Sequence, residues 1–181
     1  MPEAAAKPRA FKVILPLALL FFVPLLAAYA IFFHFPEWIP EGRTHHGVLV
    51  SPARPAPAFA ASLKGRWSFV YVAGGECAES CRRKLAQIRQ IRLALNEKRV
   101  RVQYVLAGDA PVDATFRAEH PELVLLTASA GAARAFFTPT DADALYLLDP
   151  LGNWLMSYPA AAESRGIFKD IKKLLRLSQI G

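Results

Sequence analysis

The chain contains two cysteines, Cys77 and Cys81, and both lie in one short segment. An apolar, strand-like run, Trp67–Val72, precedes them and ends at Gly74 and Gly75, and a helix-like sequence follows. The first turn of a helix stabilises a thiolate, so a cysteine at that position is reactive. If both cysteines are helical, a spacing of four places their Cβ atoms roughly 5–6 Å apart. The spacing permits a disulfide or the capture of a soft metal ion, and it does not choose between them.

A structural role is the alternative for the same pair. The two cysteines could form one inert disulfide, or Cys81 could be a small buried residue beside Leu85 and Ile88 on the inner face of the helix. The position after a strand, and the absence of any other cysteine, favour chemistry. We therefore take Cys77 and Cys81 as the candidate catalytic residues.

The N-terminal region predicts a membrane anchor. Residues 1–12 are short and basic, and no charged residue occurs from Val13 to Phe35, a stretch long enough to cross a bilayer as a helix. Pro16 and Pro24 are tolerated in lipid as kinks. Because the basic residues flank the near end, the positive-inside rule places residues 1–12 in the cytoplasm. We expect a single-pass protein of the inner (plasma) membrane, anchored by residues 13–35, with its C-terminal domain on the periplasmic or outer side.

A cleaved signal peptide is the alternative for this region. The segment Ala28–Ala30 has the small-x-small form of a cleavage site. The apolar run continues through that site, so we expect an uncleaved anchor. In both cases the domain is exported into a compartment where a cysteine pair can oxidise.

Composition limits the choice of partners. The formal net charge is +7, but the basic residues lack interleaved exposed aromatics or a reader motif, so we expect no nucleic-acid partner. A membrane surface or an acidic protein is the better match. Residues 36–58 are rich in proline and predict a stiff tether, in which we expect His45 and His46 to be solvated.

Residues 59–181 predict one α/β domain. Strand 67–72, a helix from residue 77 or 78 to about 97, and strand 100–107 form a βαβ unit with a parallel strand pair. A short helix or loop (109–121), a strand (123–127), a short helix (130–137), a hairpin (144–148 and 154–158) and a last helix capped by Ser164 follow. On the long helix, Leu85, Ile88, Ile91 and Leu95 should point inward, and Arg82, Arg83, Lys84, Arg89 and Arg92 outward.

This order of elements is similar to that of thioredoxin-like domains, in which helices flank a central mixed sheet. Segment 67–81, hairpin segment 145–152 and helix segment 170–175 resemble the SCO/SenC family, as do the single anchor and the proline-rich entry. The resemblance implies a membrane-anchored factor that helps to mature the copper centre of cytochrome c oxidase. It also implies that Cys77 and Cys81 bind copper or reduce a target disulfide, with an oxidase subunit or another copper-handling assembly protein as partner.

The chain departs from that family at the third copper ligand. The family's distal histidine lies shortly before the hairpin, where this chain reads Pro139–Ala144 and offers only Asp141 and Asp143. Carboxylates match copper(I) poorly. His120 is the sole histidine in the expected domain, and its charged surroundings predict a surface position.

Three functions remain open at this stage. The first is a thiol-disulfide oxidoreductase that acts through Cys77 and Cys81 on a copper-site dithiol. The second is a weak copper(I) carrier that uses the same sulfurs, with copper(I) as the one candidate cofactor. The third is a non-catalytic oxidase assembly factor in which the two cysteines form a structural disulfide.

Overall fold

The computed structural model describes residues 9–35, 45–126, 133, 135–137 and 143–180. The chain divides into two compact units, Met1–Arg43 and Thr44–Gly181.

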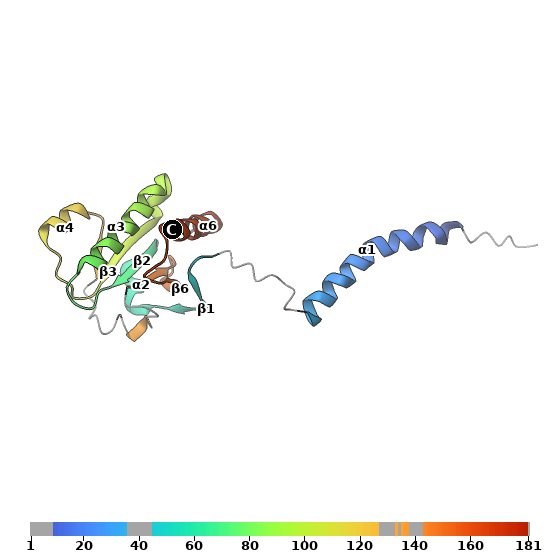
Figure 1. Ribbon diagram of the computed structural model, residues 1–181, viewed down its shortest axis with the longest axis horizontal. Coiled ribbons are helices and arrows are strands. Elements are labelled where there is room, and N and C mark those ends of the chain that lie inside the picture. Colours follow the sequence, from blue (N-terminus) through green and yellow to red (C-terminus); the bar gives the residue numbers. More distant parts are fainter. Residues whose placement is uncertain (1–8, 36–44, 127–132, 134, 138–142, 181) are drawn as a thin grey trace, which may run out of the picture. The chain divides into compact units, whose positions relative to one another are not determined.

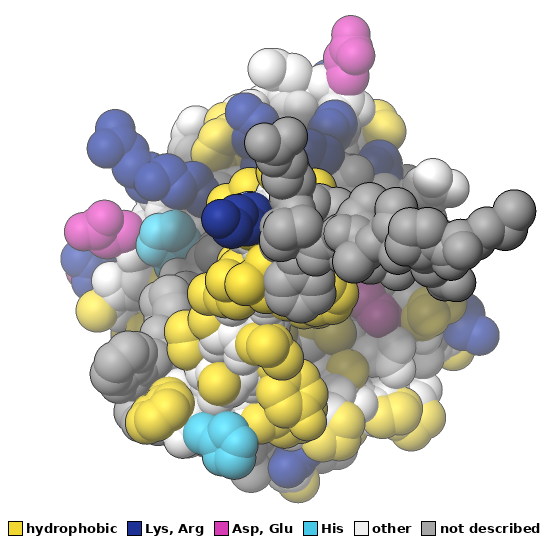
Figure 2. Space-filling model, turned by 90° about the vertical axis from the view of Figure 1, so that its right-hand side faces the viewer, with side chains coloured by type: hydrophobic (Ala, Val, Ile, Leu, Met, Phe, Trp, Pro, Cys, Tyr) yellow, Lys and Arg dark blue, Asp and Glu magenta, His cyan; other side chains and the backbone are white. Residues whose placement is uncertain are grey.

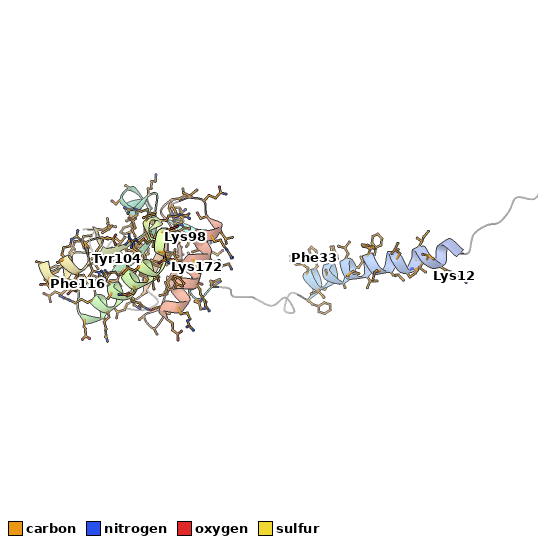
Figure 3. All side chains as sticks on the ribbon, turned by 90° about the horizontal axis from the view of Figure 1, so that it is seen from above. Lys12, Phe33, Lys98, Tyr104, Phe116 and Lys172 are labelled. Atoms are coloured by element: carbon orange, nitrogen blue, oxygen red, sulfur yellow. A yellow bond between two sulfur atoms is a disulfide. The ribbon has the colours of Figure 1, made fainter. Side chains whose placement is uncertain are left out.

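The first unit contains helix α1, Arg9–His34, with Pro16 and Pro24 inside it. Its segment Lys12–His34 is long and apolar enough to cross a membrane, and no residue of its most apolar window is buried within the protein. Figure 3 shows Lys12 and Phe33 at opposite ends of the helix. The large hydrophobic side chains of this helix are exposed, and hydrophobic side chains are coloured yellow in Figure 2. These properties agree with the expected single-pass anchor.

The second unit is built on a six-stranded sheet in the order β1-β6-β5-β2-β3-β4. Strand β2 pairs with β3, and β3 with β4, in parallel, whereas the pairs β2–β5, β5–β6 and β6–β1 are antiparallel. The sheet is therefore mixed, as the sequence predicts. The strands are β1 (Val48–Pro55), β2 (Trp67–Val72), β3 (Val102–Ala107), β4 (Val124–Leu126), β5 (Leu145–Leu148) and β6 (Asn153–Tyr158).

Helices cover both faces of this sheet (Figure 1). Alternate residues of β2 point to opposite faces, so Phe69 packs with the buried residues of α3 and α6, and Val70 packs with those of α2. The arrangement of layers is that of a thioredoxin-like α/β domain, and the predicted fold class is confirmed. The helices are α2 (Pro57–Leu63), α3 (Glu79–Ala94), the 3₁₀ helix η2 (Asn96–Arg101), α4 (Ala114–Glu119) and α6 (Ser164–Leu177).

The domain takes in residues that we expected in the tether. Strand β1 pairs with β6 at the edge of the sheet, and α2 begins at Pro57, so the sheet and its helices start before Phe59. An edge strand needs ladder hydrogen bonds on one side only, which is why it can contain Pro52 and Pro55.

Several element boundaries also differ from the prediction. Helix α3 begins at Glu79 and ends at Ala94, and η2 separates it from β3. The last helix begins at Ser164, but its N-cap is Glu163 and no side chain caps it. Half of the helix predicted over 130–137 lies outside the described residues, and residues 133, 135 and 136 are helical.

Candidate functional site

The two cysteines are joined by a disulfide at the start of α3. Cys77 precedes the helix and Cys81 lies in its first turn, with Ala78 as the extended N-cap residue between them. Their Cα atoms are 5.2 Å apart. The structure thus brings the predicted pair together, although Cys77 is not helical as the spacing argument assumed.

Both sulfur-bearing residues are buried. Cys77 is 6% exposed and Cys81 is 3% exposed, and both join the core cluster that includes Ala73 and Phe116. The turn that leads from β2 to Cys77 contains Gly75, whose φ of 152° is strained for any residue with a side chain. Glycine therefore permits the sharp change of direction that places Cys77 above the end of β2.

Arg82 links the cysteine pair to the loop before α4. Its Nε donates to the carbonyl oxygen of Cys77 at 3.3 Å, and an Nη donates to Asp113 Oδ2 at 2.6 Å. The guanidinium also lies 5.3 Å from the centre of the Phe116 ring. Arg82 therefore holds a second segment of the chain beside the disulfide.

Asp113 has its own structural role at this position. Its side chain caps α4 by accepting from the backbone N–H of Phe116 at 2.7 Å. That hydrogen bond, followed by the hydrogen bond from Arg82, lowers the pKa of the Asp113 carboxyl from its ordinary value. The site therefore contains a carboxylate that stays ionised beside a cation.

A second carboxylate, Asp143, approaches the same helix from the segment before β5. Its Oδ1 accepts from Tyr71 Oη at 2.5 Å and from Ser80 Oγ at 3.3 Å. Ser80 lies between the two cysteines in sequence, so the network ties β2, α3 and the start of β5 together at the site. Of the two carboxylates that the sequence offers before the hairpin, Asp143 thus lies beside Ser80, and Asp141 lies outside the described residues.

An open hollow of about 430 Å³ lies beside this network. Across it, Lys84 Nζ donates to the carbonyl oxygen of Ala160 at 2.6 Å. The hollow has polar and charged walls next to the disulfide-bearing turn. Its lining residues are Ser80, Arg83, Lys84, Gln87, Asp143 and Ala160.

Two cations on α3 do not face solvent as predicted. Lys84 is 7% exposed and Arg92 is 6% exposed. Arg92 Nε donates to the carbonyl oxygen of Val102 at 2.6 Å, and its Nη1 pairs with Glu122, so the buried guanidinium has a carboxylate partner. The four predicted inward residues, Leu85, Ile88, Ile91 and Leu95, are buried.

The prediction for His120 was wrong, because the residue is only 4% exposed. Its ring stacks on Phe116, with centroids 4.3 Å apart, and its Nδ1 lies 3.2 Å from Tyr104 Oη. Figure 3 shows Tyr104 and Phe116 on the same side of the domain. Burial, and next the nearby charge of Arg89, lower the pKa of His120 from its ordinary value. His120 is therefore a neutral core residue and not a surface group.

His45 and His46, which we expected in the tether, have hydrogen-bond partners in the structure as well. His46 Nδ1 lies 3.0 Å from Asp170 Oδ1, and His46 N donates to Asp170 Oδ2 at 2.7 Å. His45 Nδ1 lies 2.7 Å from the carbonyl oxygen of Gly47. His46 is half exposed, but it is held against α6 and is not merely solvated as we expected.

The donor set does not fit a copper(II) site. Among the described residues, no three His, Cys, Asp or Glu side chains cluster closely enough to hold a metal ion. Copper(II) requires nitrogen or oxygen donors beside the sulfurs. The imidazoles of His46 and His120 are engaged with Asp170 and Tyr104.

Sequence reasoning missed Asp113 and Tyr71 at this site, and it missed the contact of Arg82 with Asp113. Asp113 had a local signal, because an Asp followed by a helical stretch is a typical N-cap. The contacts of Arg82 and Tyr71 join residues 31 and 72 positions apart, and no local pattern reports them.

The comparisons with known proteins agree with the fold. A family model described as "Transmembrane-like, thioredoxin-like, C-terminal domain" matches residues 67–178. Copper-bound yeast Sco1 has a TM-score of 0.53 at 18% identity, over 66% of this chain and 81% of that chain. Copper-bound ScoI of Arabidopsis thaliana has a TM-score of 0.52 at 18% identity, over 66% and 89% of the two chains. At this identity both likenesses concern the fold alone.

The search of curated protein sequences gave no match. The family model covers more than half of the sequence and includes the cysteine turn, the hairpin and the closing helix. The chain therefore belongs to the family of transmembrane-like, thioredoxin-like C-terminal domains.

Proposed function

We propose that this chain is a membrane-anchored, exported thiol-disulfide oxidoreductase that acts through Cys77 and Cys81. The observation that carries the proposal is the disulfide at the start of α3, with Cys77 before the helix and Cys81 inside it. The amides of the first helical turn stabilise negative charge, so the thiolate that leaves when the disulfide opens is stabilised at this place.

The exchange with a partner disulfide balances in two steps. In the reduced protein, the Cys77 thiolate attacks one partner sulfur, which forms a mixed disulfide and releases the other partner sulfur as a thiolate. The Cys81 thiolate then attacks Cys77 Sγ and releases the second partner thiolate. The partner gains two electrons, and Cys77 and Cys81 become the disulfide seen in the structure. An external dithiol must then reduce this disulfide before the next cycle.

We place the partner among copper-handling proteins, with the disulfide form of a copper-site cysteine pair of an oxidase subunit as the substrate and the copper-site dithiol as the product. This part of the proposal is supported by the resemblance of segments 67–81, 145–152 and 170–175 to the SCO/SenC family. Copper(I) transfer by the same two sulfurs is the related alternative, because two thiolates suffice for copper(I). The described residues supply no further cysteine thiolate to make such a site strong.

A structural disulfide in a non-catalytic assembly factor is the second candidate, and the burial of both cysteines favours it. The reduction potential of the pair separates the two candidates. A structural bond lies below about −300 mV, whereas a working pair lies above that value. We expect a value above it, measured on the full chain in detergent against a dithiol redox buffer. A value below it would reject the oxidoreductase.

A trapping experiment tests the order of the two steps. Cys81→Ser removes the resolving sulfur, so this variant should accumulate a mixed disulfide through Cys77 with a disulfide-bonded peptide. Cys77→Ser is the matched control and should trap much less. Equal trapping by the two variants would show that Cys77 is not the attacking residue.

A further inference from the structure

Five cationic side chains surround one shallow hollow on the surface of the domain. It has a volume of about 280 Å³, and no carboxylate lines it. Lys98 comes from η2, and the other four come from α6. Figure 3 shows Lys98 and Lys172 near each other where these two elements meet. The lining residues are Lys98, Lys169, Lys172, Lys173 and Arg176, and we call them the basic hollow.

The periodicity of α6 produces the basic hollow. Its four cations recur at spacings of three or four residues, so they share one face of the helix. Ile167, Ile171 and Leu175 occupy the opposite face and are at most 2% exposed, which locks the rotation of the helix. The cations are therefore held together by packing on the far side of the same helix.

Some cations of the domain have carboxylate partners, whereas most of those in the basic hollow do not. Arg82 pairs with Asp113, and Arg92 pairs with Glu122. Within the described part of the chain, Lys98, Lys169, Lys172 and Arg176 form no ion pair with a carboxylate. Positive charges so close together repel one another, and a bound anion would relieve that repulsion.

Exposed apolar side chains lie next to these cations. Leu177, which follows Arg176, is 68% exposed, and Ile180 is 56% exposed. Arg101 holds this end of the chain by donating to the carbonyl oxygens of Leu175, Ser178 and Ile180 at 2.8–2.9 Å. The two apolar side chains are thus presented from a segment that is tied to the domain.

We propose that the basic hollow binds the headgroups of anionic phospholipids, so that α6 and the C-terminal segment dock on the membrane surface. Cations supply the attraction to lipid phosphates, and Leu177 and Ile180 enter the interfacial region. This surface is separate from the cysteine pair, and the proposal is independent of the redox function.

Two features of this chain favour a lipid surface over an acidic protein as the ligand of the basic hollow. Helix α1 is long and apolar enough to enter a membrane, and a membrane-held domain meets headgroups at a high effective concentration. Exposed apolar side chains beside a basic helix face are the pattern of interfacial binding, whereas a purely electrostatic protein partner does not require them.

The test uses the full chain in lipid nanodiscs. Gln179→Cys introduces a thiol beside Leu177, and an environment-sensitive fluorophore carrying an iodoacetamide labels only that thiol while Cys77 and Cys81 stay disulfide-bonded. We expect blue-shifted emission when phosphatidylglycerol is mixed into phosphatidylcholine, but not in phosphatidylcholine alone. Salt should reverse the shift, because it screens charges at the surface.

Charge variants identify the surface that is responsible. Lys169→Gln/Lys172→Gln should lower the ratio of docked to undocked protein about 25-fold, at about 5-fold for each cation removed. Arg54→Gln/Arg165→Gln removes the same charge from exposed positions outside the basic hollow and should keep the shift. Unchanged thermal unfolding shows that each variant is folded.

Two results would overturn the proposal. One is an emission shift that does not depend on the basic hollow. It would be equal in neutral and anionic nanodiscs, or equal in Lys169→Gln/Lys172→Gln and in the unsubstituted protein. The other is a probe that stays solvated on anionic nanodiscs but responds to added polyglutamate, which would assign the basic hollow to an acidic polypeptide.

Discussion

His120 carries a proton-linked contribution to stability because it is buried as a neutral ring against Phe116 and Tyr104. Burial, and next Arg89, lower its pKa in the folded state. The unfolded chain therefore takes up the proton first as the pH falls. Stability linked to this residue is fully present above the unfolded pKa of about 6.5 and decreases as the pH falls from there toward the lower folded pKa.

Urea unfolding at a series of pH values measures this contribution. We expect the free energy of unfolding to fall as the pH drops through about 6.5, and His120→Asn to remove that part of the slope. The variant should also be less stable at pH 8, because Tyr104 Oη loses its partner. An unchanged slope in the variant would assign the pH dependence to other groups.

Cys77 and Cys81 should differ in reactivity once the disulfide is reduced. Cys77 lies before the first turn of α3, where helix amides and the guanidinium of Arg82 favour a thiolate, and Cys81 is the more deeply buried of the two. Alkylation across a pH series, followed by mass spectrometry of the peptides, should label Cys77 first. Equal rates, or faster labelling of Cys81, would contradict this assignment.

At the scale of elements, local patterns in the sequence predict most of the fold. The aromatic and β-branched run of β2, the apolar stripe of α3 and the Asp149–Asn153 turn of the hairpin each report on their own segment. Strand β1 could not be predicted in the same way. It is largely exposed and rich in proline, and its place depends on pairing with β6, about 100 residues away.

The carboxylate of Asp170 connects α6 to the residues just before β1. It is 3% exposed and accepts from the backbone amides of His46 at 2.7 Å and Gly47 at 3.1 Å, and from Tyr158 Oη at 3.3 Å. No side chain fits at Gly47 or Gly166 beside this contact, because a Cβ added there would lie 2.7–2.8 Å from side-chain atoms of neighbouring residues. A single buried side chain thus joins the first strand to the last helix.

Asp170→Asn should destabilise the domain by about 2 kcal/mol or more. The N–H groups of His46 and Gly47 and the hydroxyl of Tyr158 would lose a charged acceptor, and the new amide N–H₂ group would face donors that it cannot pair with. Urea unfolding at constant pH measures the change. Asp109→Asn, at an exposed position, is the matched control and should stay within about 0.5 kcal/mol of the unsubstituted protein. Equal effects of the two substitutions would show that the Asp170 contacts contribute little.

At the scale of the whole molecule, the sequence predicts the division into an apolar helix and an α/β domain, since composition alone separates them. It does not predict the surroundings of the site. The contacts Tyr71–Asp143 and Arg82–Asp113 depend on how distant segments come together around the sheet. The buried position of His120 depends in the same way on Tyr104, which lies on β3.

The expected topology is testable with reporter fusions. A periplasmic-type reporter fused after Ile180 should be active, and a cytoplasmic-type reporter at the same position should be inactive, because residues 1–12 are held inside by their positive charge. N-terminal sequencing of the mature protein checks cleavage. An N-terminus at Ile31 would contradict the uncleaved anchor and would leave the expected compartment unchanged.

Metal binding by the whole chain is the last test. We expect reduced protein titrated anaerobically with copper(II) to show no stable sulfur-to-copper charge-transfer band, because the described residues offer no third ligand near the cysteines. Cys77→Ser is the control for any band that does appear. A one-to-one complex whose band is lost in that variant would mean that a histidine or carboxylate reaches the sulfurs.

The attachment of His46 and Gly47 to Asp170 also has a mechanical consequence. A force that pulls on the chain before residue 46 acts on the hydrogen bonds of His46 and Gly47 to Asp170, a clamp that lies ahead of the sheet. The force is then passed to α6 through the Asp170 carboxylate. Beyond the clamp, the antiparallel ladder between β1 and β6 is next in line. Tension applied through the N-terminal chain would therefore be resisted first by the contacts of His46 and Gly47 with Asp170, and then by β1. The disulfide lies later in the chain than both, so the cysteine turn would keep its geometry while β1 carried the force.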